Sequence, residues 1–113
     1  MARYVLMFVN DETFRERSKA EVDAVYAEIT RWSRDLETRG ILKGGMELQP
    51  KRTATTVRRV NGKMQVFDGP FVESKEHVGG FAMIEVADRD EAIRIARSFP
   101  GGVELRPVVE HPA

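Results

Sequence analysis

Residues 68–81 hold the densest group of side chains in this chain that could do chemistry. The carboxylate of Asp68 could act as a general base or orient a ligand, and His77 could form a proton-transferring pair with it. Each residue also has an explanation that involves no catalysis. Asp68 precedes Gly69-Pro70, where an aspartate often caps the turn backbone, and His77 could be a solvated loop histidine. We predict Asp68 and His77 as catalytic residues and keep both alternatives open.

Three charged residues near this segment could bind a ligand: Arg58, Glu73 and Lys75. An arginine can hold a carboxylate through two parallel hydrogen bonds, and Lys75 adds a second positive charge. A small polar, anionic or phenolic ligand would suit this set. In the alternative, Arg58 pairs with Glu73 or Glu85, and residues 73–76 form a solvated turn.

Other kinds of chemistry find little support in the sequence. The absence of cysteine excludes disulfides, thiolate nucleophiles and zinc sites with cysteine ligands. The two histidines and the scattered carboxylates match no metal-ligand spacing, and no nucleotide loop or nucleophile triad is present. We therefore predict neither metal nor cofactor. If the protein is an enzyme, the natural reaction class is a cofactor-independent proton transfer or elimination.

The balance of charge argues against nucleic acid and membranes as partners. Lys+Arg and Asp+Glu both number 18, so the formal net charge is zero. An acid-free basic stretch lies between Glu47 and Asp68, but no aromatic side chain alternates with its bases before Phe67, so we interpret it as a solvated hairpin. The apolar N-terminal run, residues 4–9, is too short for a secretory signal or a membrane span, and we expect a cytoplasmic protein.

The first half of the chain predicts a strand, a long helix and a second strand. Residues 4–9 are β-formers without alternation, which is typical of a strand buried on both faces. Ser18 and Glu21 form a capping box, and the helix that follows ends where Gly40 can adopt a left-handed conformation. Its apolar positions have helical spacing, and we expect them to face the core: Val22, Val25, Tyr26, Ile29, Trp32 and Leu36. Next comes a strand opened by Ile41-Leu42, with a bulge at Gly44-Gly45.

Two strands at 53–60 and 63–67 flank Asn61-Gly62, a strong signal for a two-residue hairpin. That loop fixes the register, so Val57 faces Val66 and both share a face with Asp68. If the two valines point into the core, Asp68 lies at its rim and points inward.

The last third of the chain predicts a strand at 80–86, a helix capped by Asp88 and an edge strand at 103–106. We therefore expect one domain over residues 1–113, of class α+β, with a ferredoxin-like antiparallel sheet, two helices on one face and an inserted β-hairpin. Helices on one face leave the other face of strands 4–9 and 80–86 uncovered. We predict that a second copy of the chain covers it, as a homodimer through the sheet face.

The chain also resembles the DGPF-type branch of the YCII-related domains along almost its whole length. The resemblance centres on Asp68-Gly69-Pro70-Phe71 and extends to Gly44-Gly45, Gly79-Gly80 and 103–108. It implies a dimeric α+β barrel. Some similar proteins are proposed enzymes with a His–Asp pair, one branch removes chloride from a chlorinated hydroquinone, and some accompany extracytoplasmic-function sigma factors.

The chain departs from the family pattern at several positions. The helix expected at 18–39 has no histidine, although the proposed catalytic histidine of the similar enzymes lies on that helix. Met46 stands where the family commonly has glutamate, so the carboxylate of Glu47 is expected on the opposite face of its strand. Two hypotheses follow: a small-ligand or enzyme site at Asp68, and a non-enzymatic dimeric binding or regulatory module, which would connect to sigma factors by family association alone.

Overall fold

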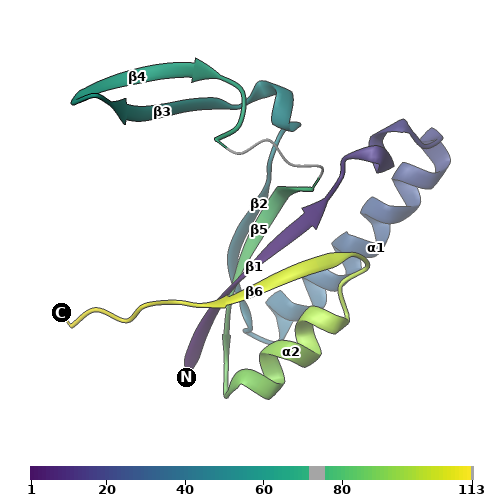
Figure 1. Ribbon diagram of the computed structural model, residues 1–113. Coiled ribbons are helices and arrows are strands. Elements are labelled where there is room, and N and C mark those ends of the chain that lie inside the picture. The colour runs from purple at the N-terminus through teal and green to yellow at the C-terminus, as the bar shows by residue number, and fades with distance from the viewer. Residues whose placement is uncertain (72–75, 113) are drawn as a thin grey trace.

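Four antiparallel strands form the main sheet of the protein in the order β2-β5-β1-β6, and a separate two-stranded sheet is made by β3 and β4 (Figure 1). The computed structural model describes residues 1–71 and 76–112. Both helices lie on one side of the main sheet (Figure 1). The expected α+β class, with two helices, a four-stranded antiparallel sheet and an inserted hairpin, is therefore confirmed.

The central strands of the main sheet are β1 (Ala2–Asn10) and β5 (His77–Val86), and the edges are β2 (Leu42–Glu47) and β6 (Gly102–Pro107). Alternate residues of the central strands face the helices and are buried, Leu6 and Ile84 completely. Their neighbours along each strand point to the uncovered face, where Val5 pairs with Met83 in the register.

Helix α1 (Lys19–Thr38) begins at the predicted cap, where the Ser18 hydroxyl oxygen accepts a hydrogen bond from the Glu21 amide. It ends at Gly40, whose φ of 72° provides the expected left-handed residue. A short 3₁₀ turn, η1 (Thr13–Glu16), connects β1 to α1. Leu36, near the C-terminal end, is the one buried residue of α1. The expected apolar positions of α1 before it are half-buried, and of these Trp32 packs against the core, so the expected core-facing stripe is found in part.

Helix α2 (Arg89–Arg97) is capped by Asp88, whose carboxylate accepts from the Glu91 amide at 2.9 Å. Its buried residues Ala92 and Ile95 close the core with residues from both central strands and from α1. That core occupies the half of the sheet where β5 ends and α2 begins. The opposite half of the sheet is therefore left with fewer side chains above it.

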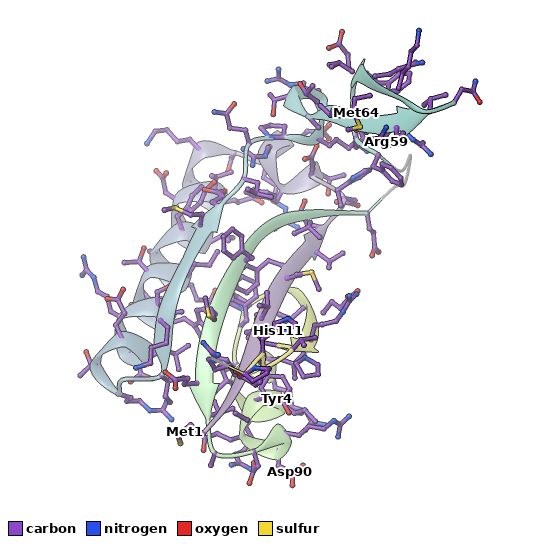
Figure 2. The ribbon with its side chains drawn as sticks, turned by 90° about the vertical axis from the view of Figure 1, so that its left-hand side faces the viewer. Met1, Tyr4, Arg59, Met64, Asp90 and His111 are labelled. Carbon is purple, nitrogen blue, oxygen red and sulfur yellow. The ribbon has the colours of Figure 1, made fainter. Side chains whose placement is uncertain are left out.

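The hairpin of β3 (Thr55–Val60) and β4 (Lys63–Asp68) has the predicted register, with Val57 opposite Val66 and Thr55 opposite Asp68. Asn61 and Gly62 both have positive φ, at 50° and 81°, as a type I′ turn requires. The hairpin projects away from the main sheet (Figure 1). In Figure 2, Arg59 and Met64 mark the hairpin and Tyr4 marks the distant main sheet.

The condition for an inward-pointing Asp68 is not met within this chain. Val57 is 55% exposed and Val66 is 69% exposed, so this face of the hairpin does not reach the core. The reason is that a short 3₁₀ turn, η2 (Lys51–Thr53), directs the chain away from the sheet before β3 begins. Glu12 anchors that turn, because its carboxylate Oε2 accepts a hydrogen bond from the Lys51 amide at 2.8 Å.

Candidate functional site

A cleft of about 810 Å³ lies between α1, which lines it from Val25 to Glu37, and the part of the sheet next to the hairpin connection. Its walls come from β1, η1, α1, β2, β5 and the segment that follows α2. A volume of this size is within the range of small-molecule sites, which is about 300–1,000 Å³.

Small residues form the floor of the cleft. A Cβ atom at Gly45 would lie 2.5 Å from the Phe81 carbonyl oxygen, and one at Gly80 would lie 2.8 Å from the Met46 carbonyl oxygen. Both positions therefore require glycine because neighbouring strand backbone occupies the space. As a consequence, β2 and β5 place no side chain at these two positions to fill the space beneath α1.

Helix α1 forms the roof of the cleft. Leu36 fixes one end of the helix in the core, whereas Val25, Tyr26 and Ile29 are only half-buried and line the open space. These residues have the helical spacing that the sequence indicates, but the glycine floor leaves them without partners of sufficient size. These half-buried apolar side chains of α1 therefore form the roof of the cleft.

One end of the cleft is aromatic. The rings of Phe8 and Phe99 stack at a centroid distance of 4.2 Å, and Trp32 meets both edge-on at 5.9 and 5.1 Å. The indole Nε1 donates to the Ser98 hydroxyl oxygen at 2.8 Å, which in turn donates to the Ile95 carbonyl at 2.6 Å. The indole orientation is therefore fixed, and its apolar surface is available to a flat ligand.

The other end of the cleft is polar. The Tyr26 hydroxyl donates to Glu47 Oε2 at 2.6 Å, and Arg15 Nη2 lies 3.8 Å from the same oxygen. Arg15 also donates to the Leu48 carbonyl at 3.3 Å, which holds η1 beside the end of β2. Glu47 Oε1 has no hydrogen-bond partner within residues 1–71 and 76–112. This end of the cleft presents a carboxylate oxygen that can still accept.

The hydrogen bond to Glu47 raises the pKa of the Tyr26 hydroxyl above its usual 10.0, and burial of the phenol and the negative charge of Glu47 add to the shift. The phenol is therefore firmly protonated at neutral pH. It stays a donor to Glu47 and offers only its lone pairs to anything else.

The predicted catalytic pair does not line this cleft. Asp68 is exposed at the end of β4, and its carboxylate makes no hydrogen bond or ion pair with any described residue. His77 is half-buried at the start of β5, opposite Asn10. Its Nε2 atom is buried and has no hydrogen-bond partner among the described residues. No described contact joins Asp68 to His77, and their catalytic role stays a prediction.

The predicted ligand-binding residues lie on or next to the hairpin. The Arg58 guanidinium lies 4.6 Å from the centroid of the Phe71 ring, which is a cation–π contact. Glu85 lies 3.6 Å from Lys43, so it is engaged on the main sheet and not by Arg58. Glu73 and Lys75 lie outside the described residues. Arg58 also borders a hollow of about 370 Å³ on the hairpin, with Phe67 and Pro70.

The sequence indicated some of the cleft residues but gave them other roles. Tyr26 and Trp32 were expected in the core; both line the cleft, and Trp32 also packs against the core. Glu47 was expected to point to the face opposite that of Met46, and this is confirmed, because Met46 is 71% exposed on the uncovered face while Glu47 meets Tyr26. The signal that could have located the cleft is the pairing of Gly45 and Gly80 with a half-apolar helix.

Two negative findings hold for the part of the chain that the structure describes. No group of three or more histidine, aspartate or glutamate side chains there could hold a metal ion. No helix there has the length and apolar character to cross a membrane.

Two comparisons with known proteins find similarity over nearly the whole chain. The model of the YCII-related domain matches residues 2–111. An uncharacterized protein of Rhizobium meliloti (strain 1021) is 34% identical over 112 residues, an alignment that covers 93% of this chain and 90% of the relative. Neither comparison names an activity.

Proposed function

Because the chain belongs to the YCII-related domain family, whose description and matched relative name no reaction, we propose its function from the cleft: the protein binds a small, largely apolar molecule between α1 and the sheet. The observation that carries the proposal is the combination of a cavity of about 810 Å³ with an aromatic end and the anchored carboxylate of Glu47 at the other end. Most small-molecule sites have this composition, with an apolar wall and few converging polar groups.

The alternative location on the hairpin is less suitable for a ligand. The hollow beside Arg58 is less than half as large, at about 370 Å³, and Asp68 does not line it. The proposed ligand site is therefore the cleft. Glu47 and Tyr26 have the ligand-binding role there that the sequence-based hypothesis assigned to Asp68 and Arg58.

The binding proposal can be tested with the protein's own fluorescence. Trp32 is the only tryptophan in the sequence and lines the cleft, so a bound ligand changes its emission. A library of small aromatic and alicyclic compounds would be titrated against the purified protein. We expect saturable changes, with hits competing for one site. If no compound shifts the emission or protects the protein from thermal unfolding, the proposal is wrong.

A proton-transfer reaction is the second candidate, and one observation favours it. The Tyr26 hydroxyl donates to Glu47 Oε2 at 2.6 Å and so orients a carboxylate that can act as a base at this site. Deuterium exchange at an acidic C–H bond of a bound compound would reveal the reaction in D₂O. Exchange that Glu47→Gln does not slow would remove Glu47 from this role. A regulatory link to sigma factors stays a prediction from family resemblance.

We also propose that two chains associate through the uncovered sheet face and the hairpin. Apolar side chains at paired positions form a stripe on that face: Val5, Met7, Met46, Phe81 and Met83. The hairpin adds Val57, Met64 and Val66 on its own exposed face. An isolated two-stranded hairpin is at best marginally stable in water, so this arm needs a covering surface.

The dimensions of the chain support a second copy as that surface. Its accessible area is 8283 Å², whereas a folded monomer of 12.8 kDa has about 6,300 Å². Its radius of gyration is 16.4 Å, against about 13 Å for a globular domain of 113 residues. The excess area is about 2,000 Å², and a standard interface needs about 800 Å² from each partner. Light scattering at micromolar concentration should give twice 12.8 kDa, and a mass of one chain would contradict the proposal.

A further inference from the structure

We propose that the cleft selects aromatic molecules whose head group donates hydrogen bonds, an ammonium above all and then a hydroxyl, with Glu47 Oε1 as the acceptor. This inference rests on the proposed function, because it names the ligand class of the same cleft. It differs from the anionic ligand predicted from the sequence, which Arg58 and Lys75 were expected to bind.

Toward a ligand, the Tyr26 hydroxyl and Glu47 Oε1 act only as acceptors. The Tyr26 hydroxyl has one proton, and it is donated to Glu47 Oε2 at 2.6 Å. Glu47 Oε1 has no partner among the residues that the structure describes. A ligand head with donors satisfies these lone pairs, whereas a carboxylate head would place acceptor against acceptor.

The charges around the cleft favour the same choice. The described lining includes the carboxylates of Glu37 and Glu47 and the guanidinium of Arg17. Arg15 is the additional cation nearest to Glu47, but at 3.8 Å it makes no hydrogen bond to the carboxylate. Arg15 therefore offsets part of the negative charge of Glu47 but leaves Oε1 open to a donor, and a ligand ammonium gains from the remaining charge.

The spacing of the two ends defines the size of the ligand. Tyr26 marks the polar end and Trp32 the aromatic end, and six residues of helix rise about 9 Å. A phenyl ring on a three-carbon chain spans this distance, with the ring against Trp32 and the head at Glu47. The proposal therefore specifies both the body and the head of the ligand.

Four probes with the same phenylpropyl body would test the inference at pH 7, with Trp32 emission as the readout: 3-phenylpropylamine, 3-phenylpropan-1-ol, 3-phenylpropionate and propylbenzene. We expect the amine to bind about tenfold or more tightly than the carboxylate, with the alcohol between them. In Glu47→Gln the amine should lose about tenfold in affinity, because the amide has no charge. Glu28→Gln, on the exposed side of α1, is the matched control and should retain the preference.

The outcomes distinguish the preference for hydrogen-bond donors from the more general proposal that the cleft binds a ligand. If propylbenzene binds but the carboxylate binds as tightly as the amine, the selection for donors is wrong and the cleft still binds ligands. If Glu47→Gln keeps the full preference for the amine, Glu47 is not the acceptor and the inference fails. If none of the four probes binds, including propylbenzene, the proposed ligand site fails as well.

Discussion

The hairpin and the cleft differ in how readily each can be predicted from the sequence. The hairpin has Asn61-Gly62, and the segment after it has Asp68-Gly69-Pro70, both of which are strong turn signals. In the structure these residues lie on a projecting arm with an exposed apolar face. The cleft has no comparable motif, yet it contains the larger cavity and the anchored carboxylate of Glu47.

The difference shows that conspicuous residues can specify backbone geometry and not chemistry. Gly69 has a φ of 105°, which side chains rarely adopt, and its amide donates to the Ala54 carbonyl at 2.8 Å. The turn therefore closes the base of the hairpin, a task that restricts residue types by itself. The cleft arises from missing side chains at Gly45 and Gly80, and their effect depends on how distant strands pair.

The largest expected effect concerns the apolar face of the hairpin. Val66→Asp should weaken dimer association by about 100-fold or more, because it would bury an unpaired charge in the proposed interface. Gln65→Asp is the matched control, since Gln65 points to the opposite face of β4 and gains the same charge. Sedimentation velocity over a dilution series would measure both. Equal effects of the two variants would mean that this face is not an interface.

Filling the cleft should produce the next largest effect. Val25→Phe adds bulk to a half-buried position of the roof, and it should weaken binding of propylbenzene by about tenfold or more through overlap with the ligand. Thr30→Phe places the same ring on the exposed side of α1 and should leave the affinity unchanged. Trp32 emission measures both variants. An undiminished affinity in Val25→Phe would locate the ligand elsewhere.

The Tyr26–Glu47 hydrogen bond should be visible in a pH titration. The pKa of Tyr26 is raised in the folded state, so the stability from this bond is fully present below pH 10.0 and is lost as pH rises through the raised value. Absorbance at 295 nm in a Tyr4→Phe background isolates Tyr26, because the chain has two tyrosines. We expect Glu47→Gln to move the midpoint to lower pH. Identical midpoints would show that the bond does not persist in solution.

The smallest effect is expected at Asp68, and it provides the sharpest contrast with Glu47. Asp68→Asn should change ligand affinity less than about twofold, and stability by less than about 0.5 kcal/mol, because the exposed carboxylate makes no described hydrogen bond. Fluorescence titration and thermal unfolding measure the two quantities. A large loss of binding in Asp68→Asn would return the site to the hairpin and support the sequence-based hypothesis.

Local signals predicted most of the fold. The Ser18 cap, the Gly40 stop and the Asn61-Gly62 turn all depend on short-range backbone chemistry, and each is found as expected. The candidate site could not be predicted in the same way. Whether Tyr26 lies in a core or a cleft depends on the side chains across from it, and the relevant neighbours, Gly45 and Gly80, are distant in sequence. The position of Asp68 depended on where a whole hairpin points, which no local pattern determines.

The Glu12 carboxylate joins the two regions, because it holds the Lys51 amide at the base of the arm while its own turn leads directly into η1 and Arg15. The arm and the mouth of the cleft therefore share one attachment point. A ligand that shifted Arg15 and a partner that shifted the arm would act on the same loop, and any coupling between their binding would be reciprocal. Such coupling would make ligand affinity depend on protein concentration.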